Sequence, residues 1–133
     1  MIVLDEAVHG PSLAKRIEAW YAGRVLSITS LRPNTVIKDD AIPTLPRAAD
    51  HPTFVTINVT DFWRKIAPDP HYGIVCVKMP PREVLELSDL LRRFFRLPHF
   101  RARSTRMGKV VRLRRNLIEY YEVDRRVRSM LWP

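Results

Sequence analysis

The sequence predicts an α/β fold in which helices cover both faces of a central, mostly parallel sheet. Short apolar segments rich in β-branched residues alternate along the chain with segments of helical periodicity, an order typical of parallel sheets. The chain has 133 residues, of which 46% are hydrophobic, enough for one core. We therefore expect a single domain over 1–133, with an α/β core in 1–80 and a basic helix, a hairpin and a tail in 81–133.

Each element follows from a local pattern. Strands are predicted, in chain order, at 1–5, 24–29, 53–58 and 72–79. Four helices are predicted. The first runs from 11 or 12 to about 21, the second begins after Asp39 or Asp40, and the third begins at Phe62. The fourth is the clearest and covers 80–97, where two prolines suit the first turn. Pro43 and Pro46 limit the second of these to a short or broken helix. A C-terminal β-hairpin is predicted over 109–123, and the tail 124–133 is compatible with a helix, a mobile segment or a docked one.

Positive charge is concentrated in the second half of the chain. The net charge is +9; residues 1–70 hold eight basic and eight acidic side chains, and residues 71–133 hold fifteen and six. Ten basic residues lie in a stretch without any acidic one: Arg92, Arg93, Arg96, Arg101, Arg103, Arg106, Lys109, Arg112, Arg114 and Arg115. Such a stretch favours binding to the phosphate backbone of RNA or DNA, or to an acidic protein partner.

Several classes of protein do not fit the sequence. No apolar run is long enough to span a membrane and no leader peptide is evident, so we expect a soluble cytoplasmic protein with no membrane partner. The lone cysteine, Cys76, lies in an apolar run and is expected to be a buried core residue. The four histidines lack the spacing of a zinc site, and no glycine-rich phosphate loop or nucleophile elbow occurs.

Acidic residues follow the strands at the edge where ligands bind in parallel sheets. Asp5 and Glu6 end the first strand, Asp61 follows the third, and Asp39 and Asp40 precede the second helix. If the first and third strands are neighbours, their ends lie within about 10 Å of each other. Clustered carboxylates suit Mg²⁺ or Mn²⁺. Four of these residues also have an alternative to metal binding. Asp39, Asp40 or Asp61 would then cap a helix, and Glu6 would be an exposed loop residue.

Three short segments, "IVLDE", "KDDAI" and "TFVTINVTDFW", resemble the PIN-like domains in order and spacing. Those proteins are small three-layer α/β/α metal-dependent ribonucleases, many of them toxins of bacterial toxin–antitoxin pairs. The resemblance covers roughly 1–80, and it is closest to a compact subgroup that opens with a strand followed by LDE.

The resemblance implies roles for individual residues. It implies Asp5 as the central ligand of Mg²⁺ or Mn²⁺, with Asp40 (or Asp39), Asp61 and Glu6 beside it. Thr56 and Asn58 would orient ligands or water. The subgroup has a second aspartate where this chain has Val59, with the uncharged Asn58 before it.

The function expected from these features is a metal-dependent endoribonuclease, as the toxin of a toxin–antitoxin pair. The first alternative is an inactive PIN-like module that binds nucleic acid or an acidic antitoxin. The second is a structural homodimer, whose contacts would come from aromatic residues: Trp63, Phe94, Phe95 and Trp132.

Overall fold

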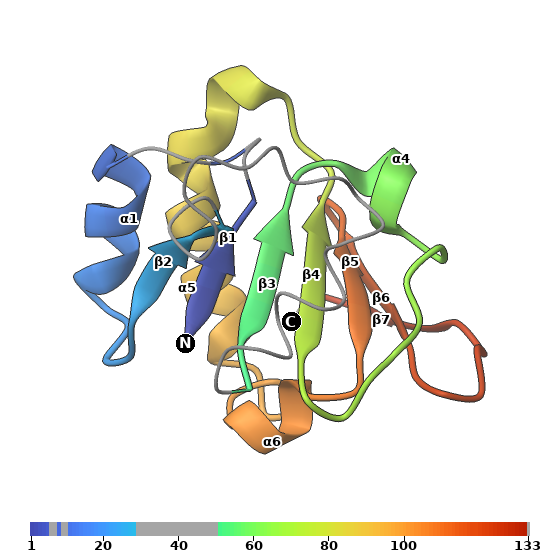
Figure 1. Cartoon of the computed structure of the whole chain (residues 1–133). Coiled ribbons are helices and arrows are strands. Elements are labelled where there is room, and N and C mark those ends of the chain that lie inside the picture. The colour runs from blue at the N-terminus through green and yellow to red at the C-terminus, as the bar shows by residue number, and fades with distance from the viewer. Residues whose placement is uncertain (6–7, 9–10, 29–50, 133) are drawn as a thin grey trace.

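The protein is built around a seven-stranded sheet with the strand order β2-β1-β3-β4-β5-β6-β7 (Figure 1). The computed structural model describes residues 1–5, 8, 11–28 and 51–132. The strands are β1 (Ile2–Leu4), β2 (Val25–Ser27), β3 (Thr53–Thr56), β4 (Gly73–Val77), β5 (Val110–Leu113), β6 (Leu117–Tyr121) and β7 (Arg128–Leu131). The first five are parallel, and β6 and β7 are antiparallel to their neighbours. The predicted mixed α/β fold with a mostly parallel sheet is confirmed.

The central strands are covered on both faces. Every residue of β1, β3 and β4 is buried, which agrees with their nearly uninterrupted apolar sequences. Successive side chains point to opposite faces, so Leu4 and Val55 join one hydrophobic cluster while Val3 and Phe54 join another. Because alternate side chains are buried in different clusters, each strand has only one orientation in which its side chains fit the two faces of the sheet.

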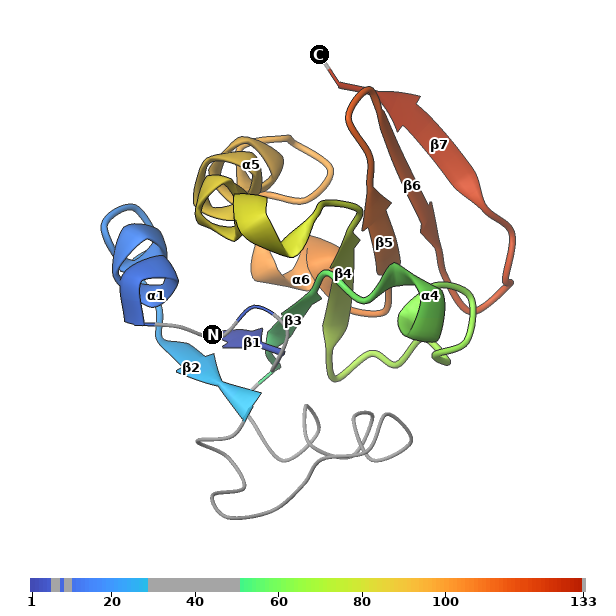
Figure 2. The ribbon, with the colours of Figure 1, turned by 90° about the horizontal axis from the view of Figure 1, so that it is seen from above.

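Helices α1 (Pro11–Glu18) and α5 (Leu87–Phe95) lie side by side on one face of the sheet (Figure 2). Leu13 and Ile17 of α1, together with Leu91 and Phe94 of α5, are fully buried against it. Their helical spacing places one apolar stripe of each helix on the strands. The short 3₁₀ helix η3 (Pro81–Glu86) leads into α5.

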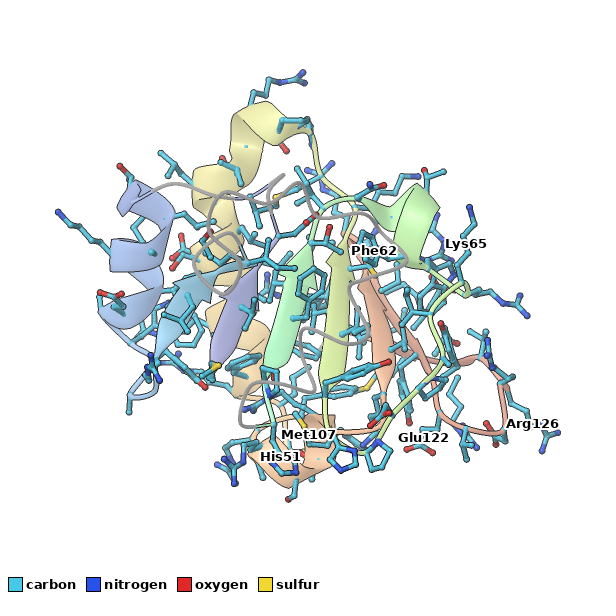
Figure 3. All side chains as sticks on the ribbon, viewed as in Figure 1. His51, Phe62, Lys65, Met107, Glu122 and Arg126 are labelled. Carbon is cyan, nitrogen blue, oxygen red and sulfur yellow. The ribbon has the colours of Figure 1, made fainter. Side chains whose placement is uncertain are left out.

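The opposite face carries the short helix α4 (Val59–Phe62) and the chain that follows it. Phe62 extends from α4 over the sheet, with its ring 5.6 Å from that of Phe54 (Figure 3). The buried Tyr121 of β6 donates a hydrogen bond of 2.6 Å to the carbonyl oxygen of Ile66. These contacts fasten the 59–66 segment to the sheet.

Helix boundaries differ from those predicted. The first helix ends at Glu18 rather than near Tyr21, and the 80–97 segment begins as a 3₁₀ helix over Pro81–Glu86 before it continues as α5. Helix α4 begins at Val59 rather than Phe62, so Asp61 lies inside it and does not cap it. The predicted helix after Asp39 or Asp40 falls outside the described residues.

Helix α6 (Arg103–Arg106) was not predicted, because four residues carry too little periodic signal. It packs against the first residue of β4, where a side chain would not fit. A Cβ atom on Gly73 would lie 2.5 Å from the carbonyl oxygen of Arg106. Glycine at this position therefore allows α6 to approach the sheet.

The C-terminal hairpin is confirmed: β5 and β6 pair antiparallel, with Val111 opposite Tyr120. The tail adds an unpredicted strand, β7, which pairs with β6. Trp132 then donates a hydrogen bond of 2.8 Å from Nε1 to the carbonyl oxygen of Arg114. The tail is thereby tied to the hairpin turn.

The aromatic residues predicted as dimer contacts are engaged within the chain. Phe94 and Phe95 belong to the core, and Trp63 packs edge-on against Tyr121 with ring centroids 5.2 Å apart. Arg93 stacks on Trp132 at 4.9 Å. Among the described residues, no helix is both long and apolar enough to cross a membrane.

Candidate functional site

In open parallel sheets a crevice is expected where the strand order reverses, and in this sheet that position lies between the carboxyl ends of β1 and β3. After β1 the chain forms β2 on one side of it, and β3 then pairs with the other side of β1. In open parallel sheets, ligands bind at this reversal point, outside the carboxyl ends of the strands. The first and third strands are neighbours, which is the condition on which the acidic site depends.

Asp5 lies directly at this crevice. It follows the last residue of β1, and its backbone N–H donates to the carbonyl oxygen of Val55 at 2.9 Å. The side chain is 8% exposed, and Thr56 Oγ1 donates to its Oδ2 at 2.7 Å. The backbone N–H of Asn58 in turn donates to Thr56 Oγ1 at 2.9 Å. This chain of hydrogen bonds holds the Asp5 carboxylate in one orientation at the sheet edge.

Asp5 is the first member of a polar row that crosses the sheet on the α4 face. Thr56 is in register with Cys76, Cys76 with Arg112, and Arg112 with Glu119. We call Asp5, Thr56, Cys76, Arg112 and Glu119 the polar row. The row thus brings residues from or just after five strands, from position 5 to position 119, into one line near the carboxyl edge.

The far end of the row is an ion pair. Arg112 donates from Nε and Nη2 to the same Glu119 oxygen at 2.9 and 2.7 Å. Its guanidinium stacks on the Trp63 ring at 4.7 Å. Arg112, predicted as a nucleic-acid contact, is therefore already bound to a carboxylate and a ring, which fixes its position.

A cleft of about 740 Å³ opens at the carboxyl edge, over the ends of β3, β4 and β5. The described residues that line it are Ile57, Asn58, Val59, Thr60, Lys78, Met79, Pro80, Arg112, Arg114 and Arg115. Four of them are basic and none is acidic. Lys78, Arg114 and Arg115 are exposed, so the cleft presents cations to solvent. Its electrostatic character favours a phosphate-bearing ligand.

The predicted acidic ligands are described only in part. Asp5 is in place; Asp61 lies in α4, just after β3, although its side chain is not among those described; and Glu6, Asp39 and Asp40 fall outside the described residues. No three metal-binding side chains cluster within the described part of the chain. The carboxylate of Asp5 is the kind of oxygen ligand that Mg²⁺ and Mn²⁺ prefer.

The ten predicted basic residues do not share one surface. Four of them, Arg93, Arg112, Arg114 and Arg115, lie at the carboxyl edge. Arg92, Arg96, Arg101 and Arg106 surround a pocket at the amino edge, and Arg103 lines another there with His51. Lys109 is half-buried and donates to the carbonyl oxygen of Thr105. The stretch is continuous in sequence but divided in space between the two ends of the sheet.

Arg106 is used inside the fold. Only 6% of it is exposed, and it donates to Thr53 Oγ1 at 3.1 Å and to the carbonyl oxygens of Phe100 and Arg101 at 2.9 and 2.8 Å. Its guanidinium also stacks on Phe95 at 4.2 Å. We therefore assign it a structural role and leave it out of the phosphate-binding set.

Sequence reasoning missed Lys78. Lys78 directly follows β4, and the residue after a parallel strand lies at the ligand-binding edge. The predicted strand runs over 72–79 and so includes Lys78, and only its true end at Val77 places Lys78 at that edge.

Cys76 is buried as predicted, and its burial gives a testable chemical consequence. Burial raises the pKa of this thiol from 9.0 to about 12, with Arg112 opposing the rise and Asp5 adding to it. The native thiol should therefore react with iodoacetamide at pH 8 at least about 100-fold more slowly than the urea-unfolded chain. The stability linked to this group is present below pH 9 and is lost as the pH rises toward 12. Equal rates in the two states, followed by mass spectrometry, would contradict this assignment.

Comparisons with protein-family models, with curated proteins and with solved structures gave no match for this chain. The fold defines a class, a mixed α/β protein with a mostly parallel seven-stranded sheet. The particular activity has to be inferred from the site itself.

Proposed function

We propose that this protein is a metal-dependent nuclease that acts on RNA, with Asp5 as the central ligand of Mg²⁺ or Mn²⁺. The observation that carries the proposal is the buried Asp5 carboxylate, oriented by Thr56 at the strand-order reversal and located at the same edge as a basic cleft. A nuclease needs these two features together, an oxygen ligand for a cation and a surface for phosphate.

Each residue near the crevice has a role in this proposal. Thr56 holds Asp5 through its hydroxyl, and the backbone of Asn58 holds Thr56. Asp61, Asp40 or Asp39, and Glu6 are the proposed further ligands, on the resemblance of their segments to PIN-like domains. A bound divalent cation would supply a more acidic water and neutralise charge on the phosphate.

The basic cleft gives the proposed path of the RNA backbone. Lys78, Arg114 and Arg115 are exposed along it. The neighbouring cleft of about 600 Å³ is also lined by Glu83, Glu86 and Asp89. These carboxylates would repel phosphate there, so we place the backbone on the α4 side of the hairpin turn. On the resemblance of its segments to PIN-like domains, we propose that this ribonuclease acts as the toxin of a toxin–antitoxin pair.

The alternative is a PIN-like module that binds nucleic acid or an acidic antitoxin without cleaving RNA. The specific observation in its favour is Val59, which occupies the position of a second aspartate and, in this structure, begins α4. A site with fewer carboxylates binds a divalent cation less strongly.

The test is an RNA cleavage assay on the purified protein. Labelled single-stranded and hairpin RNAs are incubated with Mn²⁺, with Mg²⁺, or with EDTA, and the products are resolved by electrophoresis. We expect cleavage that requires the metal and stops with EDTA. RNA binding that weakens steeply with salt, without cleavage in any metal, would favour the binding module. If the protein neither bound nor cleaved RNA, the nuclease and the nucleic-acid-binding module would both be contradicted, and only the antitoxin-binding form of the alternative would be left.

A further inference from the structure

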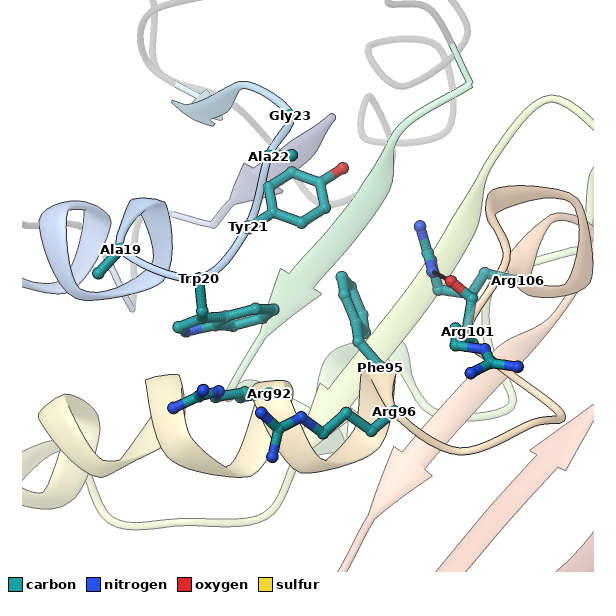
Figure 4. Close-up of a pocket in the computed structure, with 10 residues that line it drawn as sticks. All are labelled: Ala19, Trp20, Tyr21, Ala22, Gly23, Arg92, Phe95, Arg96, Arg101 and Arg106. Carbon is teal, nitrogen blue, oxygen red and sulfur yellow. Dashed lines mark hydrogen bonds between the residues drawn. The ribbon is translucent and has the colours of Figure 1, made fainter.

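A second pocket, of about 440 Å³, lies at the amino edge of the parallel strands, at the opposite end of the sheet from Asp5. Its described lining residues are Ala19, Trp20, Tyr21, Ala22, Gly23, Arg92, Phe95, Arg96, Arg101 and Arg106 (Figure 4). They come from the end of α1, the turn before β2, the end of α5 and the segment before β5. Three of them are aromatic, four are arginines and none is acidic.

The aromatic side chains form a fixed wall. Trp20, Tyr21 and Phe95 contact one another edge-to-face, with ring centroids 5.7 to 6.1 Å apart. Trp20 Nε1 donates to Ser88 Oγ at 2.9 Å, which fixes the indole against α5. Burial raises the pKa of Tyr21 above its ordinary value, so the phenol stays neutral at physiological pH. The wall therefore brings no negative charge to the pocket.

Gly23 leaves room beside this wall for the far end of the Tyr21 side chain. A Cβ atom on Gly23 would lie 2.8 to 2.9 Å from the Tyr21 ring. Without a side chain at position 23, the ring folds back over the turn and becomes part of the pocket (Figure 4).

The arginines divide into one structural member and three available ones. Arg106 is committed to the hydrogen bonds described above, one of them to the carbonyl oxygen of Arg101 (Figure 4). Arg92, Arg96 and Arg101 are exposed, and no ion pair with a carboxylate occupies them among the described residues. Free guanidinium groups at a concave site bind phosphate through forked hydrogen bonds.

We propose that this pocket binds a nucleoside monophosphate, with the base against Trp20 and Tyr21 and the phosphate on Arg92, Arg96 and Arg101. The arrangement favours this ligand because the buried ring of Phe95 lies inside and the exposed cations lie at the rim. A phosphotyrosine peptide would require the reverse order, since its phosphate lies at the far end of the ring. The volume lies within the range typical of small-molecule pockets.

The ligand has two possible sources, a free nucleotide and an end or unpaired nucleotide of an RNA strand. Both offer the same base and phosphate to the pocket. The proposal goes beyond the nuclease activity, since it uses no residue of the carboxyl-edge cleft.

The test is calorimetric titration in low salt with EDTA, so that the outcome is independent of metal binding at Asp5. We expect AMP or another nucleoside 5′-monophosphate to bind with a Kd on the order of 10–100 µM, a value typical of a ligand of that size. Ribose 5-phosphate and inorganic phosphate, which lack the base, should bind at least about tenfold more weakly. Equal affinity for ribose 5-phosphate, or no binding of any nucleotide at millimolar concentration, would overturn the proposal.

Variants locate the site. Arg92→Ala/Arg96→Ala removes two exposed cations and should weaken nucleotide binding at least about tenfold. Arg82→Ala/Arg126→Ala removes two exposed arginines outside the pocket and is the matched control. Equal losses in both double variants would mean nonspecific charge attraction and would overturn the proposal. Circular dichroism of each variant shows whether the fold is intact.

Competition distinguishes the sources. A 5′-phosphorylated RNA tetranucleotide that displaces AMP at lower concentration than AMP itself identifies an RNA strand end as the ligand. Displacement only by mononucleotides identifies a free nucleotide. Tighter binding of a phosphotyrosine peptide than of any nucleotide would overturn the assignment.

Discussion

Replacing Asp5 with asparagine is expected to abolish metal-dependent RNA cleavage while leaving the fold intact. The substitution keeps the shape of the side chain and an oxygen that accepts from Thr56, but it removes the negative charge of the central ligand. We expect the rate to fall at least about 100-fold, more than is usual for residues that only support a ligand. Cleavage assays and a calorimetric Mn²⁺ titration on the same protein measure the two effects.

Asp124→Asn is the matched control for this experiment. Asp124 is an exposed aspartate in the β6–β7 loop, paired with Arg128 at 2.7 Å and far along the chain from the crevice. Its replacement should change neither cleavage nor Mn²⁺ binding. If Asp5→Asn kept full cleavage in protein free of contaminating nucleases, Asp5 would not be the central ligand and the proposed mechanism would be wrong.

The second large effect is expected at Arg106, on stability. Arg106→Met fills part of the same volume but leaves Thr53 Oγ1 and two carbonyl oxygens without their donor. The stacking on Phe95 is also weakened. Loss of a buried, charged donor from several acceptors should lower the free energy of unfolding by about 2–4 kcal/mol. Urea denaturation followed by circular dichroism measures this difference.

Arg126→Ala provides the comparison, because Arg126 is exposed in the same half of the chain. Its free energy of unfolding should change by less than about 0.5 kcal/mol. A similarly small change for Arg106→Met would mean that the buried guanidinium contributes nothing net to stability. In that case its desolvation would offset its hydrogen bonds.

The sequence is sufficient to predict six of the seven strands, all but β7, and the edge at which a site would lie. The apolar segments around Ile2, Phe54 and Ile74 predict buried strands, because their β-branched and aromatic side chains suit positions covered on both faces. The hairpin near Arg115 follows in the same way from alternation within a few residues. These signals are local, so a single segment is sufficient to reveal them.

The structure alone decided how distant segments meet. The polar row depends on the registers of five strands, and the separation of Arg92 from Arg112 to opposite edges depends on the direction of α5 relative to β5. Likewise, Arg106 can be buried because Thr53, 53 residues away in the chain, and two nearby carbonyl oxygens accept hydrogen bonds from its guanidinium. The local sequence does not distinguish Arg106 from its exposed neighbours. Charge is a property of a single residue, whereas burial depends on the contacts that the residue makes in the folded chain.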